Sequence, residues 1–450
     1  MLYRCGVDRE SPKTVRRARI PSGRLERLAR IGWLAGEVTL GGLAEGARRL
    51  LGGGSEARSV FVTRTNAQRL ARRLSSLRGA AMKLGQLLSL EGDDYLPEEI
   101  TGALAILRSE AHAMPDAQLR RVLGHAYGRG WEQRFAFFGM EPVAAASIGQ
   151  VHRAWTTDGR EVALKIQYPG VAKSIDSDVD NLASVLKLSR LLSAQVDLSM
   201  VLTEAKRQLR QEADYRAEAA HLRRYAALLA GDDAFVVPRV HDDLTTAHIL
   251  AMDFVDGVPL DQVTDVPQAL RDRIGAQLYR LFFRELFEFR FVQTDPNFAN
   301  FLLLPQTEQI ALLDFGAARE VPARLSRLYA ELFGAAIARD RKVLERVVVE
   351  IGFIAADERR DRVEGVVDFF LIACEPFRHR GVYDFGNSDL PPRVRAAVVE
   401  VAVRRGLFHP PPPDTLFVHR KLAGTFLHAA RLGARLDVQA LLAPFLLRTA

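Results

Sequence analysis

The sequence holds very few cysteines and no long apolar run. Of its 450 residues only Cys5 and Cys374 are cysteines, which cannot build a disulfide framework, and neither lies in a zinc-binding Cys or His array. No stretch approaches the roughly 18 continuous apolar residues of a membrane span, and the N-terminus lacks the apolar core of a secretory signal. We therefore expect a globular protein of a reducing compartment, with no spanning segment.

Composition and charge set the next limits. Hydrophobic residues make up 48% of the chain and charged residues 26%, which argues against a disordered or fibrous class. The length allows a large domain or two to three smaller ones. The net charge is +7, and residues 1–50 contain 11 Lys and Arg against 5 Asp and Glu, so the basicity is concentrated there.

The basic arm, residues 13–51, alternates Arg-rich turns with a stretch of small apolar residues. Basic amphipathic helices bind anionic lipid surfaces, and Arg clusters also bind nucleic acid. The arm has no aromatic interleaving and no known nucleic-acid motif, so we expect no nucleic-acid partner and favour an anionic membrane surface. A solvated helix packed on its own domain is the alternative.

The pattern of apolar residues divides the rest of the chain. Residues 55–135 are predicted to be helical, and an antiparallel sheet is predicted from Phe135 onward, with Asp158-Gly159 as a hairpin turn. Residues 175–229 return to a helical period, and two short strands are predicted around Asp242-Asp243. After Leu260 nearly everything is predicted to be helical except the hairpin-like residues 298–316.

The order of several charged and polar residues along the chain indicates a type of chemistry. Lys165 ends a predicted strand in "EVALKIQ", where a buried lysine needs an anion, and Glu212 lies on a helix 47 residues later. Asp295 precedes Asn300 by five residues, and Asp314 follows in "LLDFG" after an apolar strand. A strand lysine, a helix glutamate, Asp-x-x-x-x-Asn and Asp-Phe-Gly are together the parts of a kinase-type phosphoryl-transfer site.

Each part has a chemical reason. Lys165 would neutralise the α and β phosphates of ATP, and Glu212 would hold that lysine in place. Asn300 and Asp314 offer the hard oxygen ligands that Mg²⁺ prefers. Asp295 would orient or deprotonate the attacking hydroxyl or water. The predicted cofactors are therefore ATP or ADP with Mg²⁺.

Two departures separate the chain from ordinary protein kinases. The loop that should cover the phosphates is rich in alanine instead of glycine, and the residues that we expect to bind nucleotide there are Ala144, Ala145, Ala146, Ser147 and Gln150. The His-Arg pair expected before the catalytic aspartate is replaced by Gln293-Thr294. Both changes disfavour an ordinary protein kinase.

These motifs resemble those of the UbiB/AarF atypical kinase-like family, and the resemblance covers the chain from about Pro21 to the C-terminal helices. "AAASIGQVH" is similar to the alanine-rich loop of the family, "VALKIQYPGV" to its lysine strand, and "EADYRAEA" to its Glu-x-Asp motif. "MKLGQLLS" resembles its Lys-x-Gly-Gln motif, with Lys83 and Gln86. "QTDPNFANF" and "HRKLAGTFL" resemble the coenzyme Q branch.

The resemblance implies an α+β, bilobal protein-kinase-like fold. We expect a helical N-terminal extension, residues 1–135, folded over the active site, with an antiparallel-sheet N-lobe at 136–257 and a helical C-lobe at 258–450. The family assigns Lys83 and Gln86 to the active site, beside Asp295, Lys165 and Glu212. Adenine recognition needs backbone groups, and we place it between the lobes at Asp253 and Val255.

Three functions fit this site. The first is an ATPase that supports ubiquinone or prenylquinone biosynthesis at a membrane surface, peripheral to the inner membrane of a bacterium or on the matrix side of mitochondria. The second is a phosphotransferase for a small molecule or lipid head group, and the third is a nucleotide-sensing scaffold. Quinone precursors and quinone-biosynthesis proteins are the expected partners, and the oligomeric state is open, a dimer included.

Overall fold

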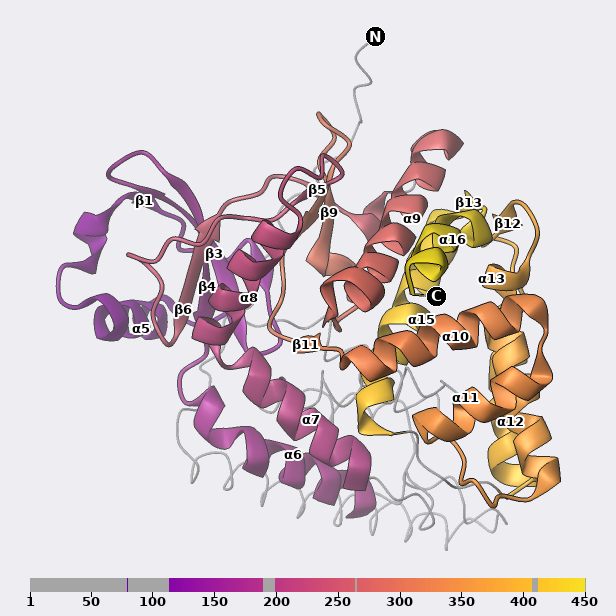
Figure 1. Ribbon diagram of the computed structural model, residues 1–450. Coiled ribbons are helices and arrows are strands. Elements are labelled where there is room, and N and C mark those ends of the chain that lie inside the picture. The colour runs from indigo at the N-terminus through magenta and orange to yellow at the C-terminus, as the bar shows by residue number, and fades with distance from the viewer. Residues whose placement is uncertain (1–78, 80–112, 189–198, 264, 407–411, 450) are drawn as a thin grey trace, which may run out of the picture. The chain divides into compact units, whose positions relative to one another are not determined.

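The computed structural model describes residues 79, 113–188, 199–263, 265–406 and 412–449 (Figure 1). Its chain forms two compact units. The described residues up to Ala219, with Val240–Phe254, belong to the first unit, and Ala220–Arg239 with Val255 onward belong to the second. The predicted basic arm lies outside the described residues, as does the predicted N-terminal extension apart from residues 79 and 113–135.

The first unit is built on an antiparallel sheet. Its strands are β1 (Phe135–Phe138), β2 (Ala144–Ala145), β3 (Gly149–Thr156), β4 (Glu161–Gln167) and β6 (Ile249–Asp253). The order is β1-β3-β4-β6, with β2 paired to β3. The helical elements of this unit are α5 (Asp116–Tyr127), η3 (Trp131–Arg134), α6 (Val171–Leu188), α7 (Ser199–Glu212) and the start of α8 (Tyr215–Leu228).

The turn between β3 and β4 confirms the prediction made from Asp158-Gly159. Gly159 has a φ of +87°, a conformation that suits glycine, and the Thr156 N–H donates to the Arg160 carbonyl at 2.9 Å to close the turn. The register that follows pairs Lys165 on β4 with Val151 on β3 and with Leu250 on β6. Lys165 therefore lies on a central strand of this sheet.

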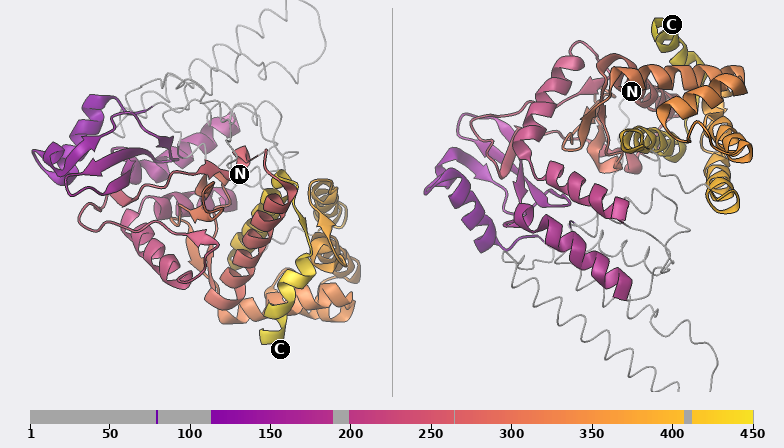
Figure 2. Two further views of the ribbon diagram at one scale, coloured as in Figure 1. Left: turned by 90° about the horizontal axis from the view of Figure 1, so that it is seen from above. Right: turned by 60° about the horizontal axis from the view of Figure 1, so that its bottom comes forward.

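The second unit is mostly helical. Its long helices are α9 (Gln268–Phe283), α10 (Ala323–Ala338), α11 (Arg341–Ile351), α12 (Arg360–Ala373), α14 (Leu390–Val399), α15 (Pro413–Leu432) and α16 (Val438–Thr449). Figure 2 gives two further views of these helices. Short helical elements are η4 (Leu260–Gln262), η5 (Arg284–Phe289), η6 (Phe298–Asn300), α13 (Glu375–Arg378) and η7 (Glu400–Arg404), of which η5 and η7 are π-helical.

Small sheets complete the second unit. The strands β5 (Phe235–Val236), β10 (Ile310–Leu312), β9 (Phe301–Leu303) and β7 (Val258–Pro259) pair in that order. Two further pairs are β8 (Phe291–Gln293) with β11 (Ala318–Glu320), and β12 (Tyr383–Asp384) with β13 (Arg435–Leu436). The last four strands were not predicted, because runs of two or three residues are too short to show an alternating pattern.

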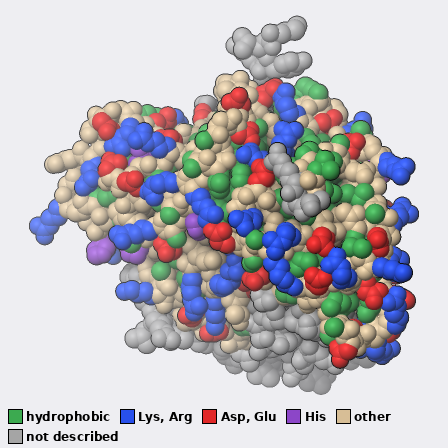
Figure 3. Space-filling view, viewed as in Figure 1, with side chains coloured by type: hydrophobic (Ala, Val, Ile, Leu, Met, Phe, Trp, Pro, Cys, Tyr) green, Lys and Arg blue, Asp and Glu red, His purple; other side chains and the backbone are tan. Residues whose placement is uncertain are grey.

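The two strands predicted around Asp242-Asp243 exist but join different sheets. β5 pairs in parallel with β10 in the second unit, whereas β6 pairs with β4 in the first. The chain therefore changes unit between them, and the hydrogen bonds of each strand go to a partner far away in sequence. Over α10, α11 and α12, the surface in Figure 3 mixes basic and acidic side chains.

Candidate functional site

Lys165 is held by a buried carboxylate. Its Nζ lies 2.8 and 3.0 Å from the two carboxylate oxygens of Glu218, and the side chains of the lysine and the glutamate are 8% and 0% exposed. The ammonium also lies 5.5 Å from the centre of the Tyr215 ring. A lysine buried this deeply needs such an anion, because an uncompensated buried charge is very costly.

The structure corrects the partner that the sequence assigned to Lys165. The paired carboxylate is Glu218, six residues beyond Glu212, and the two glutamates lie on different helices of the stretch that was predicted to be helical. α7 ends at Glu212, and the Asp214 carboxylate accepts the Ala217 N–H at 3.0 Å to cap α8, which carries Glu218. The Ser147 hydroxyl donates to the Glu212 carboxylate at 2.5 Å, so Glu212 contacts the alanine-rich loop.

The alanine-rich loop is partly exposed and partly built into the sheet. Ala144 and Ala145 form β2 with exposed side chains, and Ser147 is half-buried. A Cβ at Gly149 would lie 2.5 Å from the Ile166 carbonyl oxygen, so only glycine allows this approach of β3 to β4.

Gln150 lies inside the first unit. It is fully buried, its amide oxygen accepts the Met114 N–H at 2.9 Å, and its amide nitrogen lies 2.7 Å from Nε2 of His152. The sequence predicted that this residue binds nucleotide, but its side chain serves internal hydrogen bonds in the structure. A nucleotide contact at Gln150 would therefore involve its backbone.

The predicted adenine-binding residues lie where the chain passes from one unit to the other. Asp253 ends β6, and its carboxylate lies 2.8 Å from Nε2 of His241. Phe254 is the last residue of the first unit, and Val255 is the first of the following segment of the second. The Asp253 carboxylate is thus in contact with His241, and adenine binding at Asp253 and Val255 stays a prediction.

Asp295, Asn300 and Asp314 are positioned by the β9–β10 hairpin of the second unit. Phe301 pairs with Leu312 in this hairpin, and the Leu313 N–H donates to the Asn300 carbonyl at 3.0 Å. Asn300 therefore precedes β9 and Asp314 follows β10 at the same end of the hairpin. The Asn300 amide nitrogen donates to the Asp295 carbonyl at 3.4 Å, and an Asp314 carboxylate oxygen accepts the Gly316 N–H at 3.0 Å.

Gln293 joins the two aspartate loops. Its amide nitrogen donates to the Asp295 carbonyl at 2.6 Å and to the Asp314 carbonyl at 3.2 Å. Its amide oxygen accepts from Nζ of Lys421 at 3.2 Å. The residue that departs from the kinase His-Arg pattern therefore holds the two loops together.

Lys421 forms a second buried ion pair behind these loops. Its Nζ lies 2.9 Å from a carboxylate oxygen of Glu285, and both side chains are almost fully buried. The Tyr225 hydroxyl donates to the same carboxylate at 3.0 Å, and burial raises the pKa of Glu285 while the neighbouring Lys421 lowers it. Neither Glu285 nor Lys421 was selected from the sequence, although "HRKLAGTFL" was noted for its resemblance.

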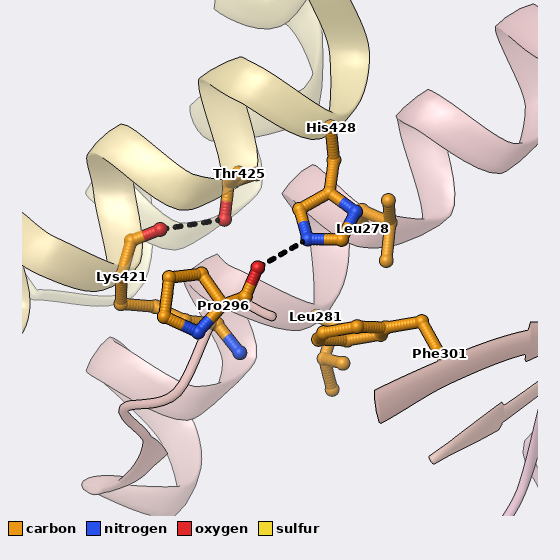
Figure 4. Close-up of a pocket in the computed structure, with 7 residues that line it drawn as sticks. All are labelled: Leu278, Leu281, Pro296, Phe301, Lys421, Thr425 and His428. Carbon is orange, nitrogen blue, oxygen red and sulfur yellow. Dashed lines mark hydrogen bonds between the residues drawn. The ribbon is translucent and has the colours of Figure 1, made fainter. Parts of the chain in front are cut away.

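One face of α15 packs on the loop that contains Asp295. A guanidinium nitrogen of Arg420 lies 3.2 Å from the Asp295 carboxylate, and a Cβ on Gly424 would lie 2.0 Å from the Cβ of Pro296. His428 donates from Nε2 to the Pro296 carbonyl at 2.9 Å (Figure 4), and its ring packs on Phe298 with the centroids 4.0 Å apart. The helix and the loop therefore touch at several points.

A small cavity of about 10 Å³ lies beside these contacts, with room for about one water molecule. Figure 4 shows its lining from α9, α15 and the 296–301 segment. The residues are Leu278, Leu281, Pro296, Phe301, Lys421, Thr425 and His428. Burial lowers the pKa of His428 to about 4, so the ring is neutral near pH 7.

The oxygen donors suit a magnesium ion. Asn300 and Asp314 supply an amide oxygen and a carboxylate, and the Asn300 amide nitrogen is turned toward the Asp295 carbonyl, which leaves its oxygen for a cation. Across the described ranges, no group of three or more His, Cys, Asp and Glu side chains gathers in a metal-binding arrangement. In proteins Mg²⁺ is usually held by one or two carboxylates together with phosphate oxygens. Lys83 and Gln86 lie outside the described residues.

A family model for the ABC1 atypical kinase-like domain matches residues 106–348. The chain belongs to this family. The atypical kinase COQ8B, mitochondrial, of Rattus norvegicus is 41% identical over 94% of this chain and 80% of its own length. The atypical kinase COQ8, mitochondrial, of Saccharomyces cerevisiae is 36% identical over 95% and 85%. These relatives confirm the resemblance to the coenzyme Q branch.

A solved structure supports the fold. The Mycobacterium tuberculosis protein Rv3197, in complex with erythromycin, superposes with a TM-score of 0.59 at 27% identity, over 84% of this chain and 94% of its own. The present chain therefore has the kinase-like fold that was predicted from its sequence. It consists of an antiparallel-sheet unit and a mostly helical unit.

Proposed function

We propose that this family member is a Mg²⁺-dependent ATPase that supports prenylquinone biosynthesis at a membrane surface. The observation that carries the proposal is the buried Lys165–Glu218 pair, together with Asp295, Asn300 and Asp314 on one pair of loops. These are the residue types, in the order along the chain, that phosphoryl transfer from ATP requires.

The proposed roles follow from the contacts. Lys165 neutralises the α and β phosphates, and Glu218 keeps its ammonium in place. Ala144, Ala145, Ala146 and Ser147 cover the phosphates, while Glu212 anchors this loop through Ser147. Asn300 and Asp314 hold the Mg²⁺, which supplies positive charge to the phosphate oxygens when bound. Asp295 orients the attacking water or hydroxyl.

The membrane role rests on relatives and on charge. The COQ8 relatives carry the word mitochondrial in their names, and the first 50 residues of this chain are strongly basic. No helix among the described residues is long and apolar enough to cross a bilayer. We propose peripheral binding to an anionic inner-membrane surface, on the matrix side if the host is eukaryotic, with quinone precursors and quinone-biosynthesis proteins as partners.

The test is ATP turnover with Mg²⁺, with and without anionic liposomes and a phenolic mimic of a quinone precursor. Asp314→Asn and Lys165→Arg should abolish turnover, whereas Lys173→Arg, an exposed lysine on α6, should behave as wild type. Free phosphate without a labelled acceptor supports the ATPase. A labelled small molecule or lipid would establish a phosphotransferase, and tight nucleotide binding without turnover would leave the scaffold function.

A further inference from the structure

The loop that carries Asp295 has no positive charge of its own. Between Asp295 and Asn300 the residues are Pro296, Asn297, Phe298 and Ala299. Among the described residues, Arg420 on α15 places a guanidinium on the Asp295 carboxylate from 125 residues away in the chain. Motif spacing did not predict this contact.

The contact is sheltered from solvent. The Arg420 and Asp295 side chains are 7% and 14% exposed, so water and salt screen their attraction less than at an open surface. Arginine keeps its charge at all physiological pH values, and its planar guanidinium presents donors in a fixed geometry. A carboxylate that accepts from such a donor is restrained in its rotation.

The position of Arg420 is itself fixed by its neighbours on α15. Lys421 is anchored by Glu285 and Gln293, Gly424 packs on Pro296, and His428 donates to the Pro296 carbonyl. Helix positions 420, 424 and 428 are one turn apart and lie on one face. The backbone that carries Arg420 is therefore attached to the same loop that carries Asp295.

From these contacts we propose that Arg420 is a positioning residue for Asp295. The guanidinium holds the Asp295 carboxylate in the orientation needed to align the attacking water or hydroxyl, and α15 transmits the rigidity of the helical unit to this side chain. The inference rests on the proposed phosphoryl chemistry. A misplacement of about 1 Å at a reacting group can reduce turnover roughly 10²-fold.

The experiment compares Arg420→Gln and Arg420→Lys with Arg431→Gln, an exposed arginine at the end of the same helix. We expect Arg420→Gln to lower kcat about 10²-fold while the Kd for MgATP, measured with a fluorescent analogue, changes less than about twofold, a factor worth under 1 kcal/mol. Arg420→Lys should recover part of the loss, because it restores the charge without the planar fork. Arg431→Gln should match wild type.

A double-mutant cycle separates positioning from other roles. In an Asp295→Asn background, Arg420→Gln should cause little further loss, because no carboxylate remains to be oriented. Losses that multiply in this background would overturn the proposal, as would a wild-type kcat in Arg420→Gln or a Kd that rises in parallel with the loss.

Failure of the inference can be told from failure of the proposed function. Absence of turnover in the wild-type protein would refute the ATPase itself, whereas turnover that is insensitive to Arg420 refutes only the positioning role. If Arg420→Gln fails to fold, as thermal melting would show, the Arg420→Lys variant and its cycle with Asp295→Asn decide the question, and equal kcat for Arg420→Lys and wild type would overturn the proposal.

Discussion

Both units bury a lysine against a glutamate, and the two pairs differ in their surroundings. The side chains of Lys165 and Glu218 are 8% and 0% exposed, and those of Lys421 and Glu285 are 4% and 0% exposed, so burial does not distinguish them. Their neighbours do. Lys421 and Glu285 bond to Gln293, which in turn holds the backbones at Asp295 and Asp314.

The difference shows that equally buried ion pairs can have different roles. A buried pair is weak evidence for stability, because the cost of removing two charges from water can exceed their attraction. We interpret Lys165–Glu218 as part of the proposed nucleotide site and Lys421–Glu285 as a support for the loops that carry Asp295 and Asp314. The following variants test this division, from the largest expected effect to the smallest.

Lys421→Met should have the largest effect. It leaves Glu285 buried without its cation and should lower the free energy of unfolding by roughly 3–5 kcal/mol, as measured by urea denaturation. Burial already raises the pKa of Glu285. Without Lys421 the group binds a proton more readily in the folded state, so the variant should be most stable at acidic pH and lose stability as pH rises through this raised pKa.

Two further variants control this experiment. Lys342→Met removes an exposed lysine on α11 and should change stability by less than about 0.5 kcal/mol. The double variant Lys421→Met with Glu285→Leu should recover most of the loss, since apolar residues can replace a buried pair. If the double variant is as unstable as Lys421→Met, the unpaired charge of Glu285 is not the cause of the instability.

Glu218→Gln is expected to impair the nucleotide site. Without its charge Glu218 no longer fixes the Lys165 ammonium, and turnover should fall roughly 10- to 100-fold. Glu212→Gln should reduce turnover less, because Glu212 contacts the covering loop through Ser147. Steady-state ATP hydrolysis checks both, and a larger loss in Glu212→Gln would restore the assignment made from the sequence.

Gly424→Ala tests how tightly α15 packs on the loop that carries Asp295. The added Cβ would lie 2.0 Å from Pro296, so the loop must shift, at a cost of about 1–3 kcal/mol. Gly334→Ala is the matched control, because nothing lies within 4 Å of its added Cβ on α10, and it should stabilise by up to about 1 kcal/mol. Thermal melting of the two variants should therefore move in opposite directions.

His419 is a buried titratable group that is neutral, in contrast to the two buried ion pairs. Burial lowers its pKa to about 4, against 6.5 for the ordinary group. Below pH 6.5 the unfolded chain binds a proton that the folded chain does not, so stability is full above this pH and falls as the pH drops toward 4.

At pH 5 this proton uptake by the unfolded chain lowers the free energy of unfolding by roughly 2 kcal/mol relative to neutral pH. In His419→Gln the fall in unfolding free energy between pH 7.5 and pH 5 should be smaller than in wild type by about this amount. Denaturant unfolding at the two pH values measures it, and equal falls in both proteins would show that His419 does not carry the effect.

Much of the site could be predicted from the sequence because its parts are local. Asp158-Gly159 predicted the β3–β4 turn, and the apolar runs around residues 298–316 predicted the β9–β10 hairpin that positions Asn300 and Asp314. The partner of Lys165 was harder to predict, because both Glu212 and Glu218 lie within the stretch that was predicted to be helical. The choice depended on the helix break that Asp214 caps.

The sequence by itself determined the family and the order of the candidate site residues, because motif spacing can be read directly along the chain. Tertiary structure alone decided which charges meet. Arg420 reaches Asp295 across 125 residues, and Lys421 reaches Glu285 across 136. Such contacts produce no periodic pattern in the sequence. A buried charge needs an opposite charge, and the packing of the helices decides which one lies near it.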